Sequence, residues 1–368
     1  MAEIVISLAN QQQREECYRL AYEIFCLEMG TMREDADHEA RQIRDEAIEA
    51  SHVLHGQADG ELAGTIGLLV GRDDRPFPEH FEHGFEISRF LSAVPRSKMA
   101  INIRFLVRPE HRSSQLPFKL MVEAAKFQFA NGIKLVFCDC QPHLLNLYQG
   151  IGFRPCAAVF EQPGFGVMVP LVYVVPDVAH LRAIRSPMIR YAKGLEDAVE
   201  AARLIALLPE QAPVLTTTDL ERASWAETMG LLSQMRERTG AFEGFTEDEI
   251  KAFLDRGQVL ECVEGQQIVV KGHGTRSAYV VMHGAAEVRL EGKLLAKIGE
   301  GELFGEFALL LATRRTADVY AKGERVRLLV LDERTLQRLL EGNAALAAKF
   351  LLNLSKSLAL RLINPTGR

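Results

Sequence analysis

The sequence predicts an α+β protein: a mixed α/β domain, a helical connector, and a C-terminal β-roll with flanking helices. Up to Pro176, strand-like runs alternate with helix-like ones. The next segment looks helical but is broken by prolines, and after Gly240 short β runs separated by glycines indicate a small barrel or roll. Domains usually have about 100–200 residues, so a 368-residue chain has room for two or three. We expect them at residues 1–176, 177–239 and 240–368.

Composition excludes several classes of protein. Lys and Arg total 43 against 49 Asp and Glu, a net charge of −6, so no basic excess indicates a nucleic-acid partner. The longest apolar stretch, residues 165–175, is interrupted by Pro170 and is shorter than the ~20 residues that cross a bilayer. We expect a buried strand there and no membrane span. The N-terminus lacks a basic segment followed by a long apolar one, which predicts a cytoplasmic protein without a secretory signal.

The cysteine and histidine patterns predict no metal site and no disulfide framework. Six cysteines are scattered along the chain, which is typical of reduced core thiols. Cys138 and Cys140 have no second pair nearby, and zinc needs four converging ligands. His80 and His83 lack a carboxylate-rich partner pattern, so we expect them to be surface residues.

The first domain is expected to begin with a helix over residues 13–29, followed at 33–49 by a charged mobile loop or solvated helix. Strand-like runs flank Ala58-Asp59-Gly60, which predicts a hairpin. The remaining elements are, in order, a Pro-rich loop at 73–84, strands at 85–91 and 100–107, a helix at 115–131, a strand at 133–140, a short helix at 142–150, and strands near 157–160 and 167–175.

The C-terminal part carries a pattern suited to a sugar phosphate, before two closing helical segments at 333–363. It runs from Gly301 to Leu310 (GELFGEFALL) and continues as Arg314-Arg315-Thr316-Ala317. A phosphate removed from water needs a guanidinium and converging backbone N–H groups. Arg315 supplies the first, and a turn at Gly305 supplies the second because glycine tolerates positive φ. Glu306 is suited to accept a hydrogen bond from a ribose hydroxyl, and Thr316 adds a hydroxyl donor.

With these residues, 240–363 resembles the cyclic nucleotide-binding domain of bacterial catabolite activators and kinase regulatory subunits. The resemblance implies that Arg315 pairs with the phosphate and Glu306 holds the ribose. It also implies that Gly305, Ala308, Thr316 and Ala317 line the site, for either cAMP or cGMP. The alternative is a roll without nucleotide, in which Arg315 and Glu306 pair with each other. Because the sequence ends at Arg368 with no further helical segment, we expect no DNA-reading helix.

A second pattern lies in the first domain, at residues 146–155 (NLYQGIGFRP) and 107–112 (VRPEHR). Together with the helix that follows residue 115, these residues resemble the GNAT-type acyltransferase superfamily over residues 1–176. The resemblance implies that Tyr148 donates a proton to a departing thiolate. It also implies that Val107, Arg112 and Asn146 bind an acyl thioester. A phenol with a pKa near 10 stays protonated at pH 7, as that role requires.

Residues 85–90 (FEISRF) resemble a strand of acyl-homoserine lactone synthases and related N-acyl amino acid synthases. By this resemblance Glu86 is the candidate base, and Ser88 and Arg89 belong to the donor site. A purely structural hydrogen-bonded strand is the alternative. The acyl donor of that subgroup is usually an acyl carrier protein.

Two departures from the pattern affect the choice of substrates. Where the superfamily has a glycine-rich phosphate loop, this chain has Gln115-Leu116-Pro117, and proline has no N–H to offer. This disfavours acyl-CoA and favours a carrier protein that delivers only a phosphopantetheine. The other departure is Ala21, where the synthase-like subgroup tends to carry Arg.

The sequence as a whole predicts a cyclic-nucleotide-regulated N-acyltransferase that takes its acyl group from an acyl carrier protein or acyl-CoA. Two alternatives remain. One is a non-enzymatic nucleotide sensor with a degenerate transferase fold, motivated by Gln115 and Pro117. The other is a protein-lysine acetyltransferase, which differs only in its acceptor.

Overall fold

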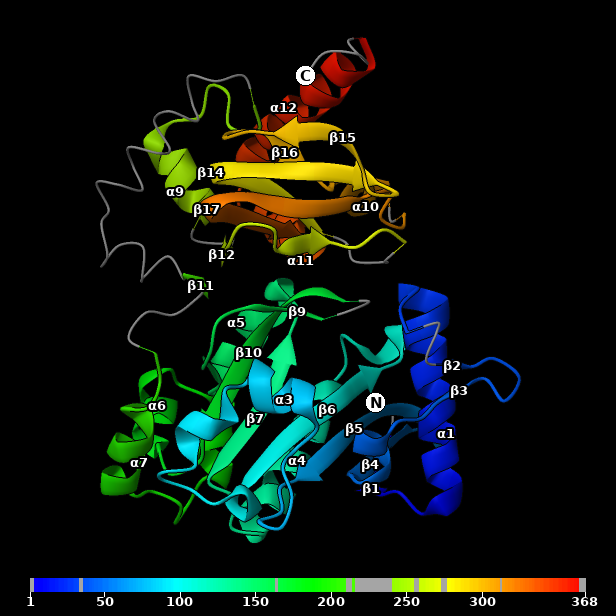
Figure 1. Ribbon diagram of the computed structural model, residues 1–368, viewed down its shortest axis with the longest axis vertical. Coiled ribbons are helices and arrows are strands. Elements are labelled where there is room, and N and C mark those ends of the chain that lie inside the picture. Colours follow the sequence, from blue (N-terminus) through cyan, green and yellow to red (C-terminus); the bar gives the residue numbers. More distant parts are fainter. Residues whose placement is uncertain are drawn as a thin grey trace. The chain divides into compact units, whose positions relative to one another are not determined.

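The structure, a computed structural model, describes residues 3–32, 36–162, 165–209, 214–215, 240–254, 258–272, 277–311 and 313–363. The chain forms two compact units (Figure 1). The N-terminal unit comprises Met1–Cys140, Leu144–Ala158 and Val169–Ala212, and the C-terminal unit comprises Gln141–His143, Val159–Met168 and Pro213–Arg368. The predicted α+β class is confirmed: one unit is a mixed sheet with helices and the other is a β-roll with helices.

An eight-stranded sheet forms the centre of the N-terminal unit. Its strands are β1 (Ile4–Leu8), β4 (His52–Ala58), β5 (Glu61–Val70), β6 (Met99–Val107), β7 (Leu135–Cys140), β10 (Gly166–Val174), β8 (Arg154–Pro155) and β9 (Phe160–Gln162), which pairs with β10. Asp59 and Gly60, both at positive φ, make the turn of the predicted β4–β5 hairpin. Each pairing is antiparallel except that of β6 with β7.

The parallel pair β6 and β7 is joined only at its beginning. Three pairs are made, the last between Ile101 and Phe137, although β6 continues to Val107 and β7 to Cys140. Within this unpaired part, β6 bulges opposite Ile66, and Arg104 has a φ of 49°. Because the bulge adds one residue to β6, the side chains after it point to the opposite face of the sheet. Ile103 therefore packs on one face and Phe105 on the other.

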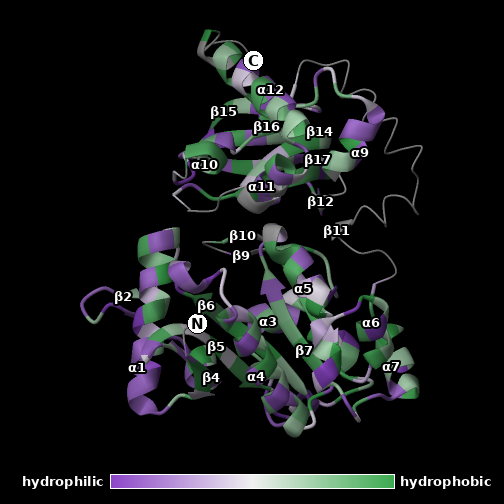
Figure 2. Cartoon of the chain, turned by 180° about the vertical axis from the view of Figure 1, so that it is seen from behind, coloured by the Kyte–Doolittle hydropathy of each residue, from purple (hydrophilic) through white to green (hydrophobic). Residues whose placement is uncertain are grey.

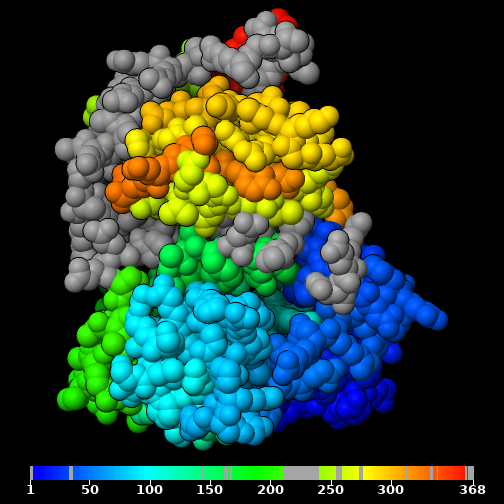
Figure 3. All heavy atoms as spheres, viewed as in Figure 1, coloured from blue at the N-terminus to red at the C-terminus, as the bar shows by residue number. Residues whose placement is uncertain are grey.

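Helices cover both faces of this sheet (Figure 1). The core on one face includes residues of α1 (Gln11–Tyr22), α2 (Glu46–Glu49) and α3 (Glu79–Gly84), and we call this the α3 face. The core on the other face includes residues of α4 (Leu116–Ala130), and we call this the α4 face. Figure 2 shows the hydrophobic colouring of the strands between these layers. In Figure 3, the cyan segment that contains α3 covers part of the visible surface of this unit.

Three sequence-based expectations for the α3 face are wrong. Residues 85–91 are not a strand, because Glu86 is left-handed at a φ of 49° and Ile87–Phe90 form a 3₁₀ helix. That turn buries Phe85, Ile87 and Phe90 on the same core. The loop at 73–84 contains α3. Within 33–49, the described residues form the hairpin β2 (Ala36–Asp37) and β3 (Gln42–Ile43) and then α2, with Ile43 fully buried.

The remaining elements of the N-terminal unit agree with the predicted helices. A π-helix, Glu23–Met29, continues α1 and ends at Gly30, α4 ends two residues before Gly132, and α5 spans Leu145–Ile151. The predicted strand near 157–160 is wrong, because residues 157–159 lie between β8 and β9 and only Phe160 belongs to a strand. The predicted connector contains α6 (Val178–Ala183), a 3₁₀ helix (Pro187–Tyr191), α7 (Ala198–Ile205) and β11 (Val214–Leu215), and its residues 210–213 and 216–239 lie outside the described ones.

The C-terminal unit is the predicted β-roll with helices around it. A seven-stranded sheet is built from β11, β12 (Gln258–Cys262), β13 (Gln267–Val269), β14 (Ser277–Leu290), β15 (Lys293–Ile298), β16 (Leu303–Phe304) and β17 (Asp318–Asp332). The helices are α9 (Glu247–Leu254), α10 (Glu306–Leu311), α11 (Glu333–Gly342) and α12 (Ala344–Ile363). Phe242, Phe253 and Phe350 join α9 and α12 to the sheet in one core.

Three chemical features of the described residues bear on function. All six cysteines are buried free thiols, as predicted. Within the ranges described, no three His, Cys, Asp or Glu residues gather as a metal site would require. No helix among them has the length and apolar character needed to span a bilayer.

Candidate functional site

The predicted phosphate cassette of the C-terminal unit is built around a buried guanidinium. Gly305 has a φ of 80°, and its carbonyl oxygen accepts a hydrogen bond of 2.9 Å from Arg315 Nη1. Arg315 Nη2 donates to Ser277 Oγ, also at 2.9 Å. Arg315 precedes β17, whereas Ser277 begins β14, so two strands and the turn before α10 position one side chain. These bonds fix the plane of the guanidinium.

Two ionisable side chains of this site are almost fully buried. Arg315 is 5% exposed and Glu306, the first residue of α10, is 2% exposed. Burial lowers the pKa of Arg315, while Tyr279 and Glu306 act in the opposite direction. The Arg315 guanidinium also lies 5.8 Å from the centre of the Tyr279 ring, which stacks on Phe304. A desolvated cation at this position is well suited to an anionic ligand.

The other predicted cassette residues surround the same turn. Ala308 lies in the first turn of α10 and is buried, Thr316 is exposed, and Ala317 is 9% exposed. The first turn of a helix leaves backbone N–H groups without partners inside the helix. The structure thus brings Gly305 and Arg315 into direct contact and places Glu306 beside Arg315.

Gly305→Ala is expected to disturb the cassette in two ways. A Cβ would meet Arg315 Nη1 at 2.5 Å, and the φ of 80° would strain any other residue. We expect a loss of about 1–3 kcal/mol in the free energy of unfolding, together with a displaced guanidinium and weaker nucleotide binding. Thermal unfolding and calorimetric titration measure the two effects.

Gly292→Ala is the matched control. Gly292 has a similar φ of 78° but nothing within 4 Å of the added Cβ. It should lose stability alone, without loss of binding. Equal loss of binding in both variants would contradict a specific contact between Gly305 and Arg315.

In the N-terminal unit, α5 places Tyr148 against β7. Tyr148 is 8% exposed, and its ring meets that of Phe153 edge to face at 5.6 Å. Burial, assisted by Cys138, Cys140 and Asp139, raises the pKa of Tyr148 well above its ordinary value. The hydroxyl therefore stays protonated at neutral pH. Asn146, on the same helix, is exposed.

The predicted donor residues Val107 and Arg112 are joined by a hydrogen bond from Arg112 Nε to the Val107 carbonyl, 3.0 Å long. The guanidinium also donates to both oxygens of Glu28, at 2.6 and 2.7 Å. Pro117 occupies the first turn of α4, where it offers no N–H. The carboxylate of Glu28 therefore occupies the two guanidinium donors of Arg112 that an incoming phosphate would need.

Glu86, Ser88 and Arg89 lie at the 3₁₀ helix on the α3 face rather than on a strand. Glu86 forms an ion pair with Arg89, and Arg89 Nη1 also donates to the Cys156 carbonyl at 3.1 Å. Ser88 is exposed. The structure thus brings Glu86 and Arg89 together and places Tyr148 on a different helix.

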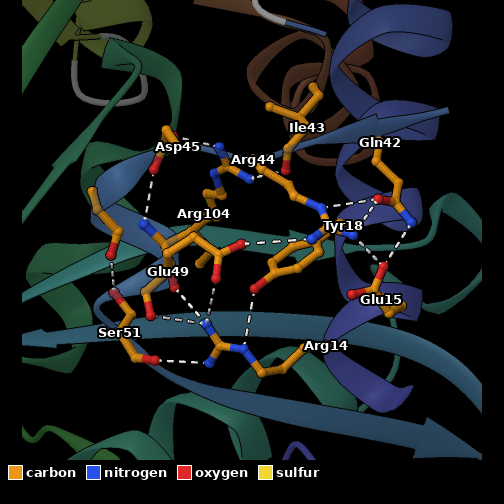
Figure 4. Close-up of polar contacts among 12 residues, drawn as sticks. Arg14, Glu15, Tyr18, Gln42, Ile43, Arg44, Asp45, Glu49, Ser51 and Arg104 are labelled. Atoms are coloured by element: carbon orange, nitrogen blue, oxygen red, sulfur yellow. Dashed lines mark hydrogen bonds and ion pairs between the residues drawn. The ribbon is translucent and has the colours of Figure 1, made fainter. Parts of the chain in front are cut away.

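A polar network holds further parts of the α3 face together (Figure 4). Arg14 on α1 donates to the Ser51 carbonyl at 2.9 Å and the Ile48 carbonyl at 2.8 Å, and Arg104 donates to the Ile43 carbonyl at 2.7 Å. Arg104 also pairs with Asp45. These bonds tie α1, β3, α2 and the bulge of β6 to one another.

Sequence reasoning missed several residues of both sites. Ser277 and Tyr279 stand far from the cassette in sequence, and no local pattern marks them. Glu28 is also distant from its partner Arg112. Asp139 had a visible signal, because it is the one acidic residue in an otherwise apolar strand, Leu135–Cys140.

Comparison with known proteins identifies both units. Residues 16–153 match the family model described as Acetyltransferase (GNAT) family. Residues 259–343 match the model described as Cyclic nucleotide-binding domain. A cGMP-dependent protein kinase, isozyme 1, of Drosophila melanogaster is 33% identical over 96 residues, which cover 24% of this chain and 12% of the kinase. The match therefore spans about an eighth of that relative.

For each part, one solved structure is an example of similarity. The N-acyl amino acid synthase FeeM from uncultured soil microbes has 12% identity and a TM-score of 0.40, over 52% of this chain and 99% of that one. The Thermus thermophilus catabolite activator protein has 30% identity and a TM-score of 0.30, over 34% and 59%. From the two family matches, this chain joins a domain of the GNAT acetyltransferase family to a C-terminal cyclic nucleotide-binding domain.

Proposed function

We propose that the chain is a cyclic-nucleotide-regulated N-acyltransferase that moves an acyl group from a thioester to an amine. The observation that carries this proposal is the presence, in one chain, of a GNAT-family domain and a cyclic nucleotide-binding domain. Tyr148 beside β7 and Arg315 beside Gly305 are the chemically suited residues of the two parts.

In this proposal Tyr148 protonates the thiolate that leaves the thioester. Its raised pKa keeps the proton on the phenol until negative charge develops on the sulfur in the transition state. Val107 and Asn146 flank the thioester arm. Ser88 and Arg89, which the resemblance assigned to the donor site, lie with Glu86 on the α3 face, so in this proposal we assign them to the acceptor side instead. The acceptor is an amine in its neutral, nucleophilic form.

The geometry favours an acyl carrier protein over acyl-CoA as donor. The pyrophosphate of CoA would have to displace Glu28 from both donors of Arg112, and Pro117 offers no amide there. A phosphopantetheine arm carries no pyrophosphate, so it needs fewer hydrogen-bond donors from this loop.

The regulatory ligand is proposed to be cAMP or cGMP. Arg315 would pair with the ring phosphate, Glu306 would accept from the ribose hydroxyl, and Gly305, Ala308, Thr316 and Ala317 would line the cradle. Support comes from the buried Arg315–Gly305 contact and from similarity to a kinase named as cGMP-dependent. Regulation requires that the nucleotide bind two states of the chain with different affinity.

Acyl transfer by the full chain tests this function. Purified protein is given matched acyl-carrier-protein and acyl-CoA thioesters with amino acid or lysine-peptide acceptors, with and without saturating cAMP or cGMP. We expect N-acylated product from the carrier-protein donor and a rate or KM that changes with one nucleotide.

Each outcome of that assay has a separate meaning. Transfer that no nucleotide alters would overturn the regulatory half of the proposal. Absence of product with either donor would favour the non-enzymatic sensor, and preference for lysine peptides would favour the protein-lysine acetyltransferase.

A further inference from the structure

Asp139 is an unusual residue for the interior of a sheet. It lies near the end of β7 between the buried thiols Cys138 and Cys140, and it remains partly accessible. Burial raises its pKa to about 6, and no side chain of the described residues contributes a compensating bond or charge. A structural carboxylate would normally be paired at such a position, so another role is indicated.

The alternation of β7 fixes the side of the sheet on which Asp139 lies. It shares a face with Phe137, whose ring lies 5.5 Å from that of Phe85 and 5.3 Å from that of Phe90. This is the α3 face, which also carries the 3₁₀ helix with Glu86.

Tyr148 belongs to the opposite side. Its ring contacts Phe153, which contacts Tyr173, and Tyr173 contacts Phe129 of α4. Tyr173 is also the cross-strand partner of Val136, which alternates with Phe137 along β7. Tyr148 thus lies on the α4 face.

Asp139 also lies in the part of β7 that does not pair with β6. The last pair between β6 and β7 is Ile101 with Phe137, and Asp139 follows Phe137 by two residues. Beyond that pair the two strands share no ladder, so a substrate carbonyl has access to backbone groups there. Asp139 and Tyr148 therefore flank the same unpaired strand ends from opposite faces.

We propose that the carboxylate of Asp139 is the proton acceptor for the attacking amine, on the face opposite to Tyr148. This inference rests on the proposed N-acyltransferase function and names its base. A thioester carbonyl between the two faces would meet the amine from the α3 face and release its thiol toward the α4 face.

The proton balance of the step closes. The amine lone pair forms the C–N bond, and the N–H proton passes to the Asp139 carboxylate. The C–S bond then breaks, its electron pair goes to sulfur, and Tyr148 gives its proton to the thiolate. Solvent carries one proton from Asp139 back to Tyr148, leaving an amide and a thiol as the only products.

The neighbouring groups leave Asp139 as the titrating base. Burial raises the pKa values of the surrounding phenol and thiols, so these stay neutral at pH 7: Tyr148, Cys138, Cys140 and Cys156. From the 3₁₀ helix, Glu86 and Arg89 face this side as an ion pair. Arg104, across the unpaired ends on β6, is paired with Asp45.

Glu86, the residue suggested by the sequence, is less suited to accept the proton. Its carboxylate is already engaged by the guanidinium of Arg89, so it is not free to contact the N–H proton of an incoming amine. We infer that this pair orients the acceptor substrate while Asp139 takes the proton.

The pH dependence of kcat/KM for acylation of an α-amine tests the assignment. The productive form needs ionised Asp139 and a neutral amine with a pKa near 8. The plot of log(kcat/KM) against pH should therefore rise with a slope of about 2 below pH 6 and about 1 between pH 6 and about 8, and level off above that. Asp139→Asn should lower kcat/KM by about 100-fold or more and show a single slope of about 1 up to about pH 8. Asp74→Asn, an exposed acid on the same unit, is the matched control.

A second readout does not depend on activity. Because burial raises the pKa of Asp139, its contribution to stability is complete below the unfolded value near 3.9 and is lost as pH rises through about 6. Asp139→Asn should therefore raise Tm above pH 7 relative to wild type and bring no gain near pH 4. A lower Tm at pH 8 would indicate a structural partner and overturn the proposal.

The assay separates this proposal from the function on which it rests. Wild type that transfers no acyl group would overturn both. Active wild type with full activity in Asp139→Asn, or a change of slope lost in Glu86→Gln but kept in Asp139→Asn, would overturn the role of Asp139 alone.

Discussion

Tyr148→Phe should lower kcat for acyl transfer by about 10²–10⁴-fold, because removing a positioned general acid typically costs that much. The fold should persist, since Phe retains the edge-to-face contact with Phe153. Among the described residues no side-chain hydrogen bond reaches the Tyr148 hydroxyl, so its removal leaves no protein partner unsatisfied. Steady-state kinetics with a carrier-protein thioester provide the measurement.

A comparison of alkyl and aryl thioesters tests whether Tyr148 acts as a general acid. An aryl thioester releases a weakly basic thiolate that needs little protonation, so it should recover most of the rate lost in Tyr148→Phe. Tyr191→Phe, on the 3₁₀ helix Pro187–Tyr191, serves as the control and should behave as wild type. An equal loss with alkyl and aryl thioesters would show that Tyr148 acts through packing and not as an acid.

Arg315→Gln should weaken binding of the cyclic nucleotide by about 10- to 100-fold. A hydrogen bond to a charged group contributes roughly 1.5–3 kcal/mol, and each 1.4 kcal/mol is a factor of ten in affinity. Glutamine keeps a donor for the Gly305 carbonyl but loses the charge and the fork that a ring phosphate requires. Calorimetric titration of cAMP and of cGMP gives the affinities.

Arg325→Gln is the control for Arg315, since Arg325 is half exposed on β17 and pairs with Glu261. Arg315→Lys should bind between wild type and Arg315→Gln, because it retains the charge without the bidentate geometry. Unchanged affinity in a folded Arg315→Gln protein would show that Arg315 does not bind the phosphate. Thermal unfolding of each variant verifies that the buried site has survived the substitution.

The sequence predicts elements well where the information is local. The Asp59-Gly60 turn and the helix that ends before Gly132 each depend on a few adjacent residues. Residues 85–91 were misassigned because Phe85, Ile87 and Phe90 suit both a strand and a helical turn. Only the left-handed Glu86 distinguishes them, and its conformation depends on the packing around it.

The candidate sites show the same division between local and distant information. The cassette from Gly305 to Ala317 is contiguous, so its motif is visible in the sequence, but the contact of Ser277 with Arg315 requires the paired strands of the roll. Likewise, the side on which Asp139 lies follows from its neighbours Phe137 and Phe85. Glu28 meets Arg112 only because α1 and its π-helix extension pack beside the end of β6.

The bulge at Arg104 divides β6 into two segments that can evolve separately. Ile103, before the bulge, contributes to the core on the α3 face, whereas Phe105 and Val107, after it, contribute to the core on the α4 face. Changes after the bulge therefore alter the core on the α4 face, where Tyr148 lies, without disturbing the core on the α3 face, where Asp139 lies. Substitutions in one half of β6 are accordingly expected to leave the packing around the residue on the other face unchanged.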